Sequence, residues 1–517
     1  MPTPTAPAPH ATVTSEPTLY PTATQPMAII TATPTDAPAA SIQWNEALKR
    51  FNLNADDGVW ARTSDRFLYL QTEADETSTL YKISAPDFKP IRLYHPATYF
   101  TLSPDDQFIV YKSGLPDSPE EKDCVMDLDG NFLRAIDDPI HGVQYHAQNA
   151  WLGPQNIVSS RYSGGQVSVH SVNIETARSA SWGASIHGNW FPPKNGYIPA
   201  TSDTGSADPR LMVIAQRFPS KHLEELDYLG GNVLRLPAYR STPQMNTIST
   251  FQDWFPNGNQ ILLFWGQFNR DNGWVPVRYD LLLWDVDKNT VRLMAPFGRA
   301  GQFSPDGKFL AYTSYGPATL DSSSKPVDSK QMPEASNGSY MQLMELSSGK
   351  VFLSLPILAR VDNEDLVFFN AYGTFQAQFS PDSRYLAFFS PGSIVVNSEG
   401  WPVGIKDSHA DAVTFNVLDL QEKSLLWSQP SIGDAEYAWS PTSNGIVFQD
   451  KGLNWHFINL REHKDTFITL GNADNVYHPG WSYDGHYLSL ESCTPSAGHG
   501  CDHDLIHVID LTGSNTP

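Results

Sequence analysis

Two cysteines and two histidines near the carboxyl end of the chain have side chains that could do chemistry. Cys493 and Cys501 lie in the segment SCTPSAGHGCDHD, together with His499 and His503. A disulfide between the two cysteines would close this short loop in an oxidising compartment. A Cys/His metal site is the alternative, although the spacing matches no established zinc pattern. Cys124 is the third cysteine, and we expect it to be a buried small hydrophobic residue.

A second group of polar side chains occupies matching places just before short apolar segments. Histidine, arginine and glutamate side chains that converge on one point can hold a divalent metal ion or an acidic ligand. Such residues also commonly bond neighbouring elements of a fold, and both interpretations stay open. The group, which could line the mouth of a central channel, consists of His187, Arg299, Gln376, Glu436 and His478.

A third group of side chains lies in segments rich in Gly, Pro and Asn. Trp274, Tyr315, Trp401 and His409 could form a platform for a sugar or a peptide. The alternative is that these side chains only fix their own loops. Because rigid folds carry binding residues on loops, we take the four as candidate ligand-binding residues.

Several reaction classes have no support in the sequence. We find no G-x-S-x-G, no H-E-x-x-H, no P-loop and no G-x-G-x-x-G motif. Serine hydrolase, zincin and nucleotide chemistry therefore have no basis here. We therefore expect no cofactor and predict no catalytic residue. The alternative is a divalent metal ion bound in the central channel of the fold.

The composition narrows the choice of partner. The formal net charge is -22, with 34 Lys and Arg against 56 Asp and Glu. This charge would repel phosphate backbones, so we expect no nucleic-acid partner. Aromatic residues make up 12% of the chain, which suits β-strands with a sizeable core. No apolar stretch is long enough for a spanning helix, so we predict no transmembrane segment.

A recurring phrase organises most of the chain. It consists of an apolar residue, Ser-Pro, a turn pair rich in Asp, Asn and Gly, and then an apolar strand. Proline fixes φ, Asp bonds its own backbone and Gly accepts positive φ, so the phrase predicts a hairpin turn. We assign Asp105, Asp306 and Asp382 to turn structure for this reason. Copies include TLSPDDQFIVYKS, QFSPDGKFLAYTS, QFSPDSRYLAFFS, AWSPTSNGIVFQD and GWSYDGHYLSLES, with a weaker first copy, VWARTSDRFLYLQT.

Most copies are followed by a second hairpin, so that each unit contains four strands. Examples are LLLWDVDKNTVRLMA, MQLMELSSGKVFLSL, TFNVLDLQEKSLLWS and HFINLREHKDTFITL. Four antiparallel strands bury one face poorly by themselves, whereas radial stacking of such units covers the faces and protects the edges. The copies QFSPDGKFLAY and QFSPDSRYLAF resemble the TolB-like, WD-like propeller repeats, and the resemblance covers residues 58–517.

The expected fold is all-β: a single β-propeller of four-stranded antiparallel blades, about eight in number and between seven and nine. Residues 1–40 are a Pro/Thr/Ala-rich tract, which we expect to be a disordered linker. The propeller would occupy residues 41–517, with 41–57 as a ring-closing strand or lead-in. The copy around Pro192 and Pro193 is expected to be irregular.

The topology of such a blade assigns a working face. The turns between first and second strands and between third and fourth strands are short and share one face. The long segments near 114–122, 267–277, 316–339, 359–373, 391–411 and 494–503 fall on the opposite face. We expect ligands there.

The predicted function is a non-catalytic, extracytoplasmic binding or scaffold propeller that presents this loop-rich face to a protein, peptide or glycan. The alternative is a metal-dependent propeller enzyme that acts on an acidic polysaccharide. Oligogalacturonate-lyase-like propellers place metal-binding histidines at the channel, and His146, His187 and His478 would be the candidates. The chain has no secretory signal as written, and we expect a secreted, periplasmic or surface-anchored protein, as a lipoprotein or in free form, that is monomeric.

Overall fold

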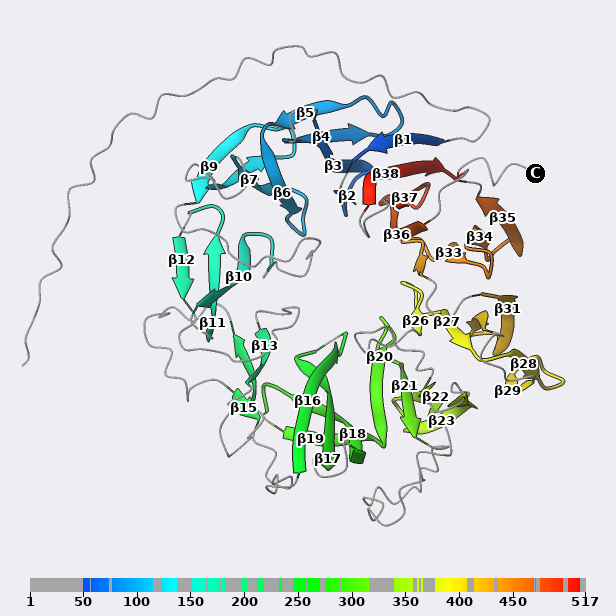
Figure 1. Ribbon diagram of the computed structural model, residues 1–517. Coiled ribbons are helices and arrows are strands. Elements are labelled where there is room, and N and C mark those ends of the chain that lie inside the picture. The colour runs from blue at the N-terminus through cyan, green and yellow to red at the C-terminus, as the bar shows by residue number, and fades with distance from the viewer. Residues whose placement is uncertain are drawn as a thin grey trace, which may run out of the picture. The chain divides into compact units, whose positions relative to one another are not determined.

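The computed structural model consists of β-strands joined by turns (Figure 1). It describes residues 50–511 except 56, 74–76, 115–121, 137–150, 152, 164–165, 177, 182–196, 203–211, 218–231, 235–244, 257, 270–274, 289, 316–338, 357–359, 362–363, 366–376, 407–412, 432–435, 469, 471–474 and 496–500. The chain divides into two units, Met1–Ser41 and Ile42–Pro517, and every described residue lies in the second. Within the described residues, no helix is long and apolar enough to cross a membrane.

In the described part of the chain, seven antiparallel sheets have four strands each. They are β2 (Asp57–Trp60), β3 (Arg66–Thr72), β4 (Ser78–Ser84) and β5 (Ile91–Tyr94); β6 (Ala97–Leu102), β7 (Phe108–Ser113), β8 (Lys122–Asp127) and β9 (Phe132–Ile136); β16 (Met245–Trp254), β17 (Gln260–Asn269), β18 (Val275–Asp285) and β19 (Thr290–Pro296); β20 (Gly298–Phe303), β21 (Phe309–Tyr315), β22 (Ser339–Glu345) and β23 (Lys350–Pro356); β26 (Gln378–Phe379), β27 (Tyr385–Ser390), β30 (Thr414–Asp419) and β31 (Ser424–Pro430); β32 (Tyr437–Trp439), β33 (Gly445–Gln449), β34 (Trp455–Asn459) and β35 (Lys464–Ile468); and β36 (Asn475–Trp481), β37 (Tyr487–Pro495) and β38 (Cys501–Asp510) with β1 (Arg50–Asn54).

Two further sheets have three strands and two have two strands in the same residues. The three-stranded sheets are β10 (Asn156–Ser163), β11 (Gln166–Asn173) and β12 (Arg178–Ser181), and β13 (Tyr197–Ser202), β14 (Met212–Arg217) and β15 (Asn232–Leu234). The pairs are β24 (Arg360–Val361) with β25 (Glu364–Asp365), and β28 (Ser393–Val396) with β29 (Pro402–Lys406). Much of the region around Pro192 and Pro193, where an irregular copy was expected, lies outside the described residues.

The recurring phrase forms the turn between the first and second strands of a sheet, as predicted. In the β20–β21 turn, Ser304 Oγ donates to Asp306 Oδ1 at 2.7 Å, and Gly307 has a φ of +71°. The amide of Phe309 donates back to Ser304 Oγ at 2.9 Å, which closes the turn. Asp105 and Asp382 accept the same serine hydrogen bond at 2.7 and 2.6 Å, so their assignment to turn structure is confirmed.

The second hairpins are also confirmed by the strand pairing. The four segments predicted for them contain the pairs β18–β19, β22–β23, β30–β31 and β34–β35. Two hairpins lie inside segments that were expected to be loops: β24 with β25 inside 359–373, and β28 with β29 inside 391–411. The sequence signal of the β28–β29 hairpin is the apolar run Ile394, Val395 and Val396 followed by an Asn-Ser-Glu-Gly turn.

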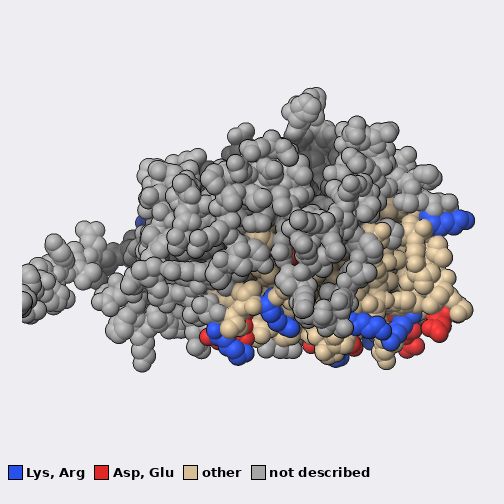
Figure 2. Space-filling view, turned by 90° about the horizontal axis from the view of Figure 1, so that it is seen from below, with Lys and Arg blue, Asp and Glu red and all other residues tan. Residues whose placement is uncertain are grey.

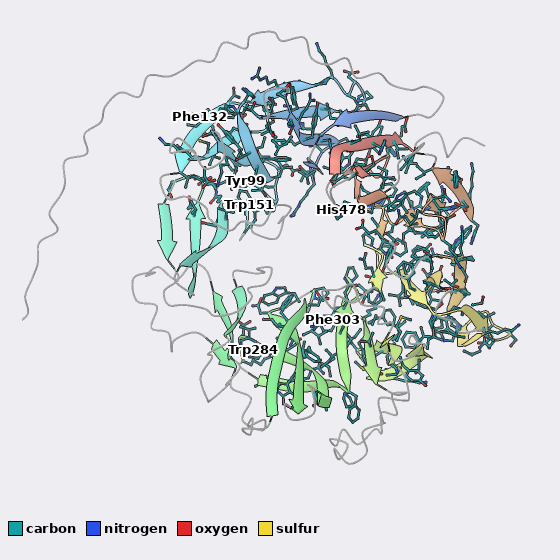
Figure 3. The ribbon with its side chains drawn as sticks, in the orientation of Figure 1. Tyr99, Phe132, Trp151, Trp284, Phe303 and His478 are labelled. Carbon is teal, nitrogen blue, oxygen red and sulfur yellow. The ribbon has the colours of Figure 1, made fainter. Side chains whose placement is uncertain are left out.

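Apolar clusters join most of the described sheets to a neighbouring sheet. Phe303, 3% exposed, lies in the cluster shared by the β16–β19 and β20–β23 sheets, whereas Trp284, 0% exposed, lies in a separate cluster within the β16–β19 sheet (Figure 3). Another cluster joins Val508 of β38 to Phe67 of β3, so the last sheet of the chain packs on the β2–β5 sheet. Four-stranded sheets that stack face to face in chain order pack as blades do in a β-propeller.

The first and last strands of the described residues share one sheet. β1 pairs with β38 in the register Arg50↔Ile509 to Asn54↔Leu505 and supplies the fourth strand beside β36, β37 and β38. The strand overlaps the amino-terminal lead-in of the sequence analysis and ends three residues before its limit at 57. This pairing ties the two ends of the second unit together.

Hydrogen bonds between turns link consecutive sheets at one end of the strands. In each case the backbone amide of the third turn residue donates to a side chain in the next sheet's turn. The pairs are Thr63 N to Asp106 Oδ2 at 2.6 Å, Asp306 N to Ser383 Oγ at 2.9 Å, Asp382 N to Ser443 Oγ at 3.0 Å and Asp484 N to Asp65 Oδ1 at 3.1 Å. The short turns of this end therefore bond to one another.

Charged side chains of both signs accompany these short turns. Lys308 pairs with Asp306 at 2.8 Å, and Lys288 pairs with Asp285 at 2.8 Å in the β18–β19 turn. Figure 2 shows Lys and Arg beside Asp and Glu along the lower edge of the view. Exposed ion pairs of this kind add little stability, but they keep the surface polar.

Candidate functional site

Two residues predicted for the channel mouth, Glu436 and His478, contact each other. Glu436 immediately precedes β32, and His478 lies within β36, the first strand of the next sheet (Figure 3). Glu436 Oε1 lies 3.4 Å from His478 Nδ1, and the backbone amide of His478 donates to Glu436 Oε2. The carboxylate thus accepts two hydrogen bonds from one residue.

The local backbone explains how β36 brings His478 to this carboxylate. The pairing of β36 with β37 shifts register between Tyr477 and Gly480, and His478 has a φ of +54°. Left-handed φ is costly for a residue other than Gly, and such strain persists only where the surroundings fix it. We read the bulge as the device that turns the His478 amide and ring towards Glu436.

The electrostatics of the pair favour an ionised glutamate. Burial by itself would raise the pKa of Glu436, but the hydrogen bonds and charge of His478 lower this pKa below its ordinary value. The His478 side chain is 59% exposed and the Glu436 side chain 39%. An exposed imidazole held by a carboxylate through one nitrogen can bind a polar ligand or exchange a proton through its ring.

The pair also joins two sheets. Glu436 belongs to the sheet that begins with β32, whereas His478 belongs to the sheet that begins with β36. The geometry therefore includes the interblade bond that the sequence analysis gave as the alternative. Neither role excludes the other, because the imidazole stays largely exposed.

Trp401 is the one predicted loop aromatic whose side chain the structure describes. Its ring stacks on Phe352 of β23 with centroids 5.7 Å apart, and its Nε1 donates to the Phe352 carbonyl at 3.3 Å. Ile394 and Ile405 of the β28–β29 hairpin pack in the same cluster. These are the contacts of a side chain that fixes its own hairpin to the neighbouring sheet.

The hairpin that Trp401 anchors has an apolar outer surface. Val395, Val396 and Val403 are 40%, 42% and 57% exposed. The hairpin stands in the connection between β27 and β30, the second and third strands of their sheet, on the face predicted to bind ligands. The sequence analysis missed these valines because it treated the segment as loop.

Several predicted site residues lie outside the described residues or have side chains outside them. Trp274, His409, His187, Gln376 and His146 are not described. The side chains of Tyr315 and Arg299 are likewise outside the description, although both residues lie in strands, β21 and β20. Their binding roles stay predictions.

The structure describes the side chain of one cysteine, Cys124, but not those of the other two. Cys124 is 5% exposed, and burial raises the pKa of its thiol, which fits the expected small hydrophobic residue. Cys493 and Cys501 lie on the paired strands β37 and β38, where the register sets Cys493 opposite Asp504 and Cys501 opposite Pro495. Their side chains lie outside the description, so the disulfide stays a prediction.

The described residues contain no group of three or more His, Cys, Asp and Glu arranged to hold a metal ion. Sequence reasoning did overlook one cluster of ionisable side chains, in which the buried His456 lies between the partly exposed Asp450 and the exposed Asp465. A possible signal was the position of His456 in the third strand, which other sheets fill with a polar residue that is also buried.

No family model and no curated protein sequence matches the chain. Solved β-propellers resemble it at low sequence identity. The Dos1 propeller has a TM-score of 0.34 and 12% identity and covers 89% of this chain and 94% of its own. The C-terminal WD40 domain of Sif2 has a TM-score of 0.39 and 10% identity, covering 89% and 97%. An oligogalacturonate lyase in complex with manganese has a TM-score of 0.36 and 11% identity, covering 88% and 99%.

Proposed function

We propose that this chain is a non-catalytic binding propeller of the TolB-like kind. It acts outside the cytoplasm and presents the face that carries the connections between second and third strands to a polypeptide ligand. If each three- or four-stranded sheet is one blade, the propeller has nine blades, the upper end of the expected range. The Pro/Thr/Ala-rich first 40 residues support a tethered or secreted protein.

The observation that carries this proposal is the difference between the two ends of the strands. At one end the turns are short, bonded to one another and charged. At the other end the β28–β29 hairpin extends from the β27–β30 connection with Val395, Val396 and Val403 exposed. Exposed apolar side chains that a neighbouring sheet holds in place are typical of binding surfaces.

The hairpin favours a polypeptide over a glycan among the ligands considered. β28 and β29 form a sheet of two strands in the described residues, and β29 lies against β23, so the outer edge of β28 is the one that an added strand could join. An extended peptide can add to such an edge through its backbone while its side chains contact the valines. Sugar ligands would need polar and aromatic groups, and the ring of Trp401 already stacks on Phe352.

The test is a screen of the purified protein on peptide and glycan arrays. The triple variant Val395→Ser/Val396→Ser/Val403→Ser removes the apolar surface, and Lys308→Ser, at the opposite end of the strands, is the matched control. We expect wild type and the control to retain the same peptides and the triple variant to bind them at least about tenfold more weakly. Peptides that all three proteins retain equally would overturn the proposal.

The lyase alternative makes a different demand. It requires metal-dependent cleavage of an acidic oligosaccharide, which His478→Ala should abolish. Such cleavage would replace the binding proposal with an enzyme, whichever peptides the arrays retain.

A further inference from the structure

A pair of polar side chains recurs between the second and third strands of several sheets. One member of the pair is on the third strand, and the other follows the second strand two residues after the residue that faces the first member. For example, Asn416 faces Phe388 and bonds Ser390. Such pairs satisfy buried polar groups within the blade. Four pairs contain no acidic side chain and are called neutral pairs below: Ser113 with Cys124 at 3.5 Å, Ser314 with Gln342 at 3.1 Å, Ser390 with Asn416 at 2.8 Å and Ser492 with His507 at 2.7 Å.

The β32–β35 sheet replaces this neutral pair with a charged group. Its second-strand position is Asp450 and its third-strand position is His456, with Asp450 Oδ2 at 3.1 Å from His456 Nε2. A third residue joins them, because both carboxylate oxygens of Asp465 lie 3.0 Å from His456 Nδ1. The neutral pairs of the other sheets show that the fold itself does not require this charge.

The positions of the two carboxylates determine which protonation state of the His456 ring can hydrogen-bond to both. A neutral imidazole has one N–H and one lone pair, whereas an ionised carboxylate is only an acceptor. His456 can satisfy both carboxylates only when both ring nitrogens carry protons. Loss of one proton would set a lone pair against a carboxylate oxygen across about 3 Å, which is repulsive.

The surroundings of the ring contain few charges besides these two carboxylates. One face of the His456 ring stacks on Phe448 of β33, with centroids 5.2 Å apart, and Phe467 of β35 meets the ring edge-on at 5.4 Å. In the described residues the charged groups bonded to the imidazole are Asp450 from β33–β34 and Asp465 from β35. Lys451 and Lys464 are the charged neighbours of these two residues in the chain.

Asp450 connects the His456 ring to the β33–β34 turn by hydrogen bonds. Its Oδ1 accepts the amides of Gly452 at 2.7 Å and Asn454 at 2.9 Å. Burial by itself would raise the pKa of Asp450, but the hydrogen bonds from Asn454, His456 and Gly452 lower it. The turn carries Leu453, 48% exposed and with a φ of +62°, on the same end of the strands as the β28–β29 hairpin.

We propose that His456 is a proton-operated lock. As an imidazolium between Asp450 and Asp465 it holds the β33–β34 turn in place, and release of one proton to solvent loosens that turn. The lock itself does not depend on any ligand. Its consequence, that pH controls how Leu453 is presented on the binding face, rests on the proposed function.

The experiment follows the imidazole and the turn separately, without ligand. Nitrogen-correlated NMR of the histidine ring reports whether one or both nitrogens carry protons, and amide hydrogen exchange reports the protection of Gly452, Leu453 and Asn454. We expect both ring nitrogens of His456 to carry protons while the turn is protected, and a fall of about tenfold or more in the protection factors once the pH is raised far enough to remove one of them. Protection factors already correct for the faster intrinsic exchange at high pH.

The chain itself supplies the matched control. The double variant Asp450→Ser/His456→Asn rebuilds the neutral pair that Ser390 and Asn416 form in the preceding sheet. We expect this variant to fold and to show turn protection that does not change with pH over the same interval. The single variant His456→Asn, which leaves Asp450 and Asp465 without their cation, should have a loose turn at every pH.

Two results would overturn the lock. One is a neutral, singly protonated His456 ring under conditions in which the turn is protected. The other is an equal fall in protection with pH in the wild type and the double variant. Failure of the peptide screen would remove the ligand consequence alone, since neither NMR nor exchange measurement uses a ligand.

Discussion

Replacing Ser383 by Ala and by Gly should separate two opposing contributions of the turn that joins the β26–β31 sheet to the β20–β23 sheet. Ser383 Oγ accepts the backbone amide of Asp306 at 2.9 Å, and Ser383 itself has a φ of +65° at 5% exposure. The preceding copy of the turn has Gly307 at this position. The serine therefore provides an interblade hydrogen bond at the cost of a strained backbone.

The magnitudes follow from these two features. Both variants lose the hydrogen bond, which contributes about 0.5–1.5 kcal/mol. Alanine keeps the left-handed strain, so Ser383→Ala should lower the free energy of unfolding by about 1 kcal/mol. Glycine relieves about 1–2 kcal/mol of strain but adds about 0.5–1 kcal/mol of unfolded-chain entropy. Ser383→Gly should thus lie within about 0.5 kcal/mol of wild type.

Urea unfolding followed by tryptophan fluorescence measures the free energies, and exchange of the Asp306 amide measures the bond. We expect faster exchange of that amide in both variants and a lower midpoint only in Ser383→Ala. Ser443, with a φ of +58° and the amide of Asp382 at 3.0 Å, is an independent repeat of the same test. Equal destabilisation by Ala and Gly at both positions would refute the strain argument, and unchanged amide exchange would refute the bond.

Three other predictions concern pH, the candidate site and the hairpin. The pKa of Asp450 is lower in the folded protein than in the unfolded chain, so the ionised carboxylate stabilises the fold above the unfolded pKa, and this stabilisation is lost as pH falls through the folded pKa. The urea midpoint of the wild type should therefore drop below about pH 4, and that of Asp450→Asn should drop less. Glu436→Gln should reduce the free energy of unfolding by about 1 kcal/mol or less, since His478 is mostly exposed, and a loss several times larger in urea unfolding would contradict the geometry. Trp401→Ala should free the β28–β29 hairpin and speed proteolytic cleavage within 393–406 several-fold, whereas Val403→Ser should leave the cleavage rate unchanged.

The turns and hairpins were predictable because their chemistry is local. Pro305, Asp306 and Gly307 fix the reversal within four residues, and the strand that follows alternates in a way that needs no distant partner. The repeat predicted that Glu436 and His478 lie where equivalent first strands begin, whereas their role at a channel mouth stays a prediction. Their contact was not predictable, because it depends on the bulge at Tyr477 and on the packing of two sheets.

The hydrogen bonds between blades and the Asp450–His456–Asp465 cluster could not be predicted from the sequence, for a different reason. Ser383 and Ser443 look like weak copies of the glycine in the repeat, and only the neighbouring sheet shows what their hydroxyls accept. His456 meets Asp450 because the β33–β34 register sets His456 opposite Phe448. The register between two strands depends on the burial of a whole face of each strand, so no single residue in the sequence predicts it.

The departures from glycine at the fourth turn position also bear on where a ligand can bind. A side chain in left-handed φ is costly, so its presence at Asp106, Ser383 and Ser443 implies a compensating contact, and in each case that contact is an amide of the adjacent turn. A turn whose side chains and amides are already bonded to its neighbours has few groups left for recognition. The opposite end, where Leu453 and the valines of the β28–β29 hairpin are exposed, keeps that capacity.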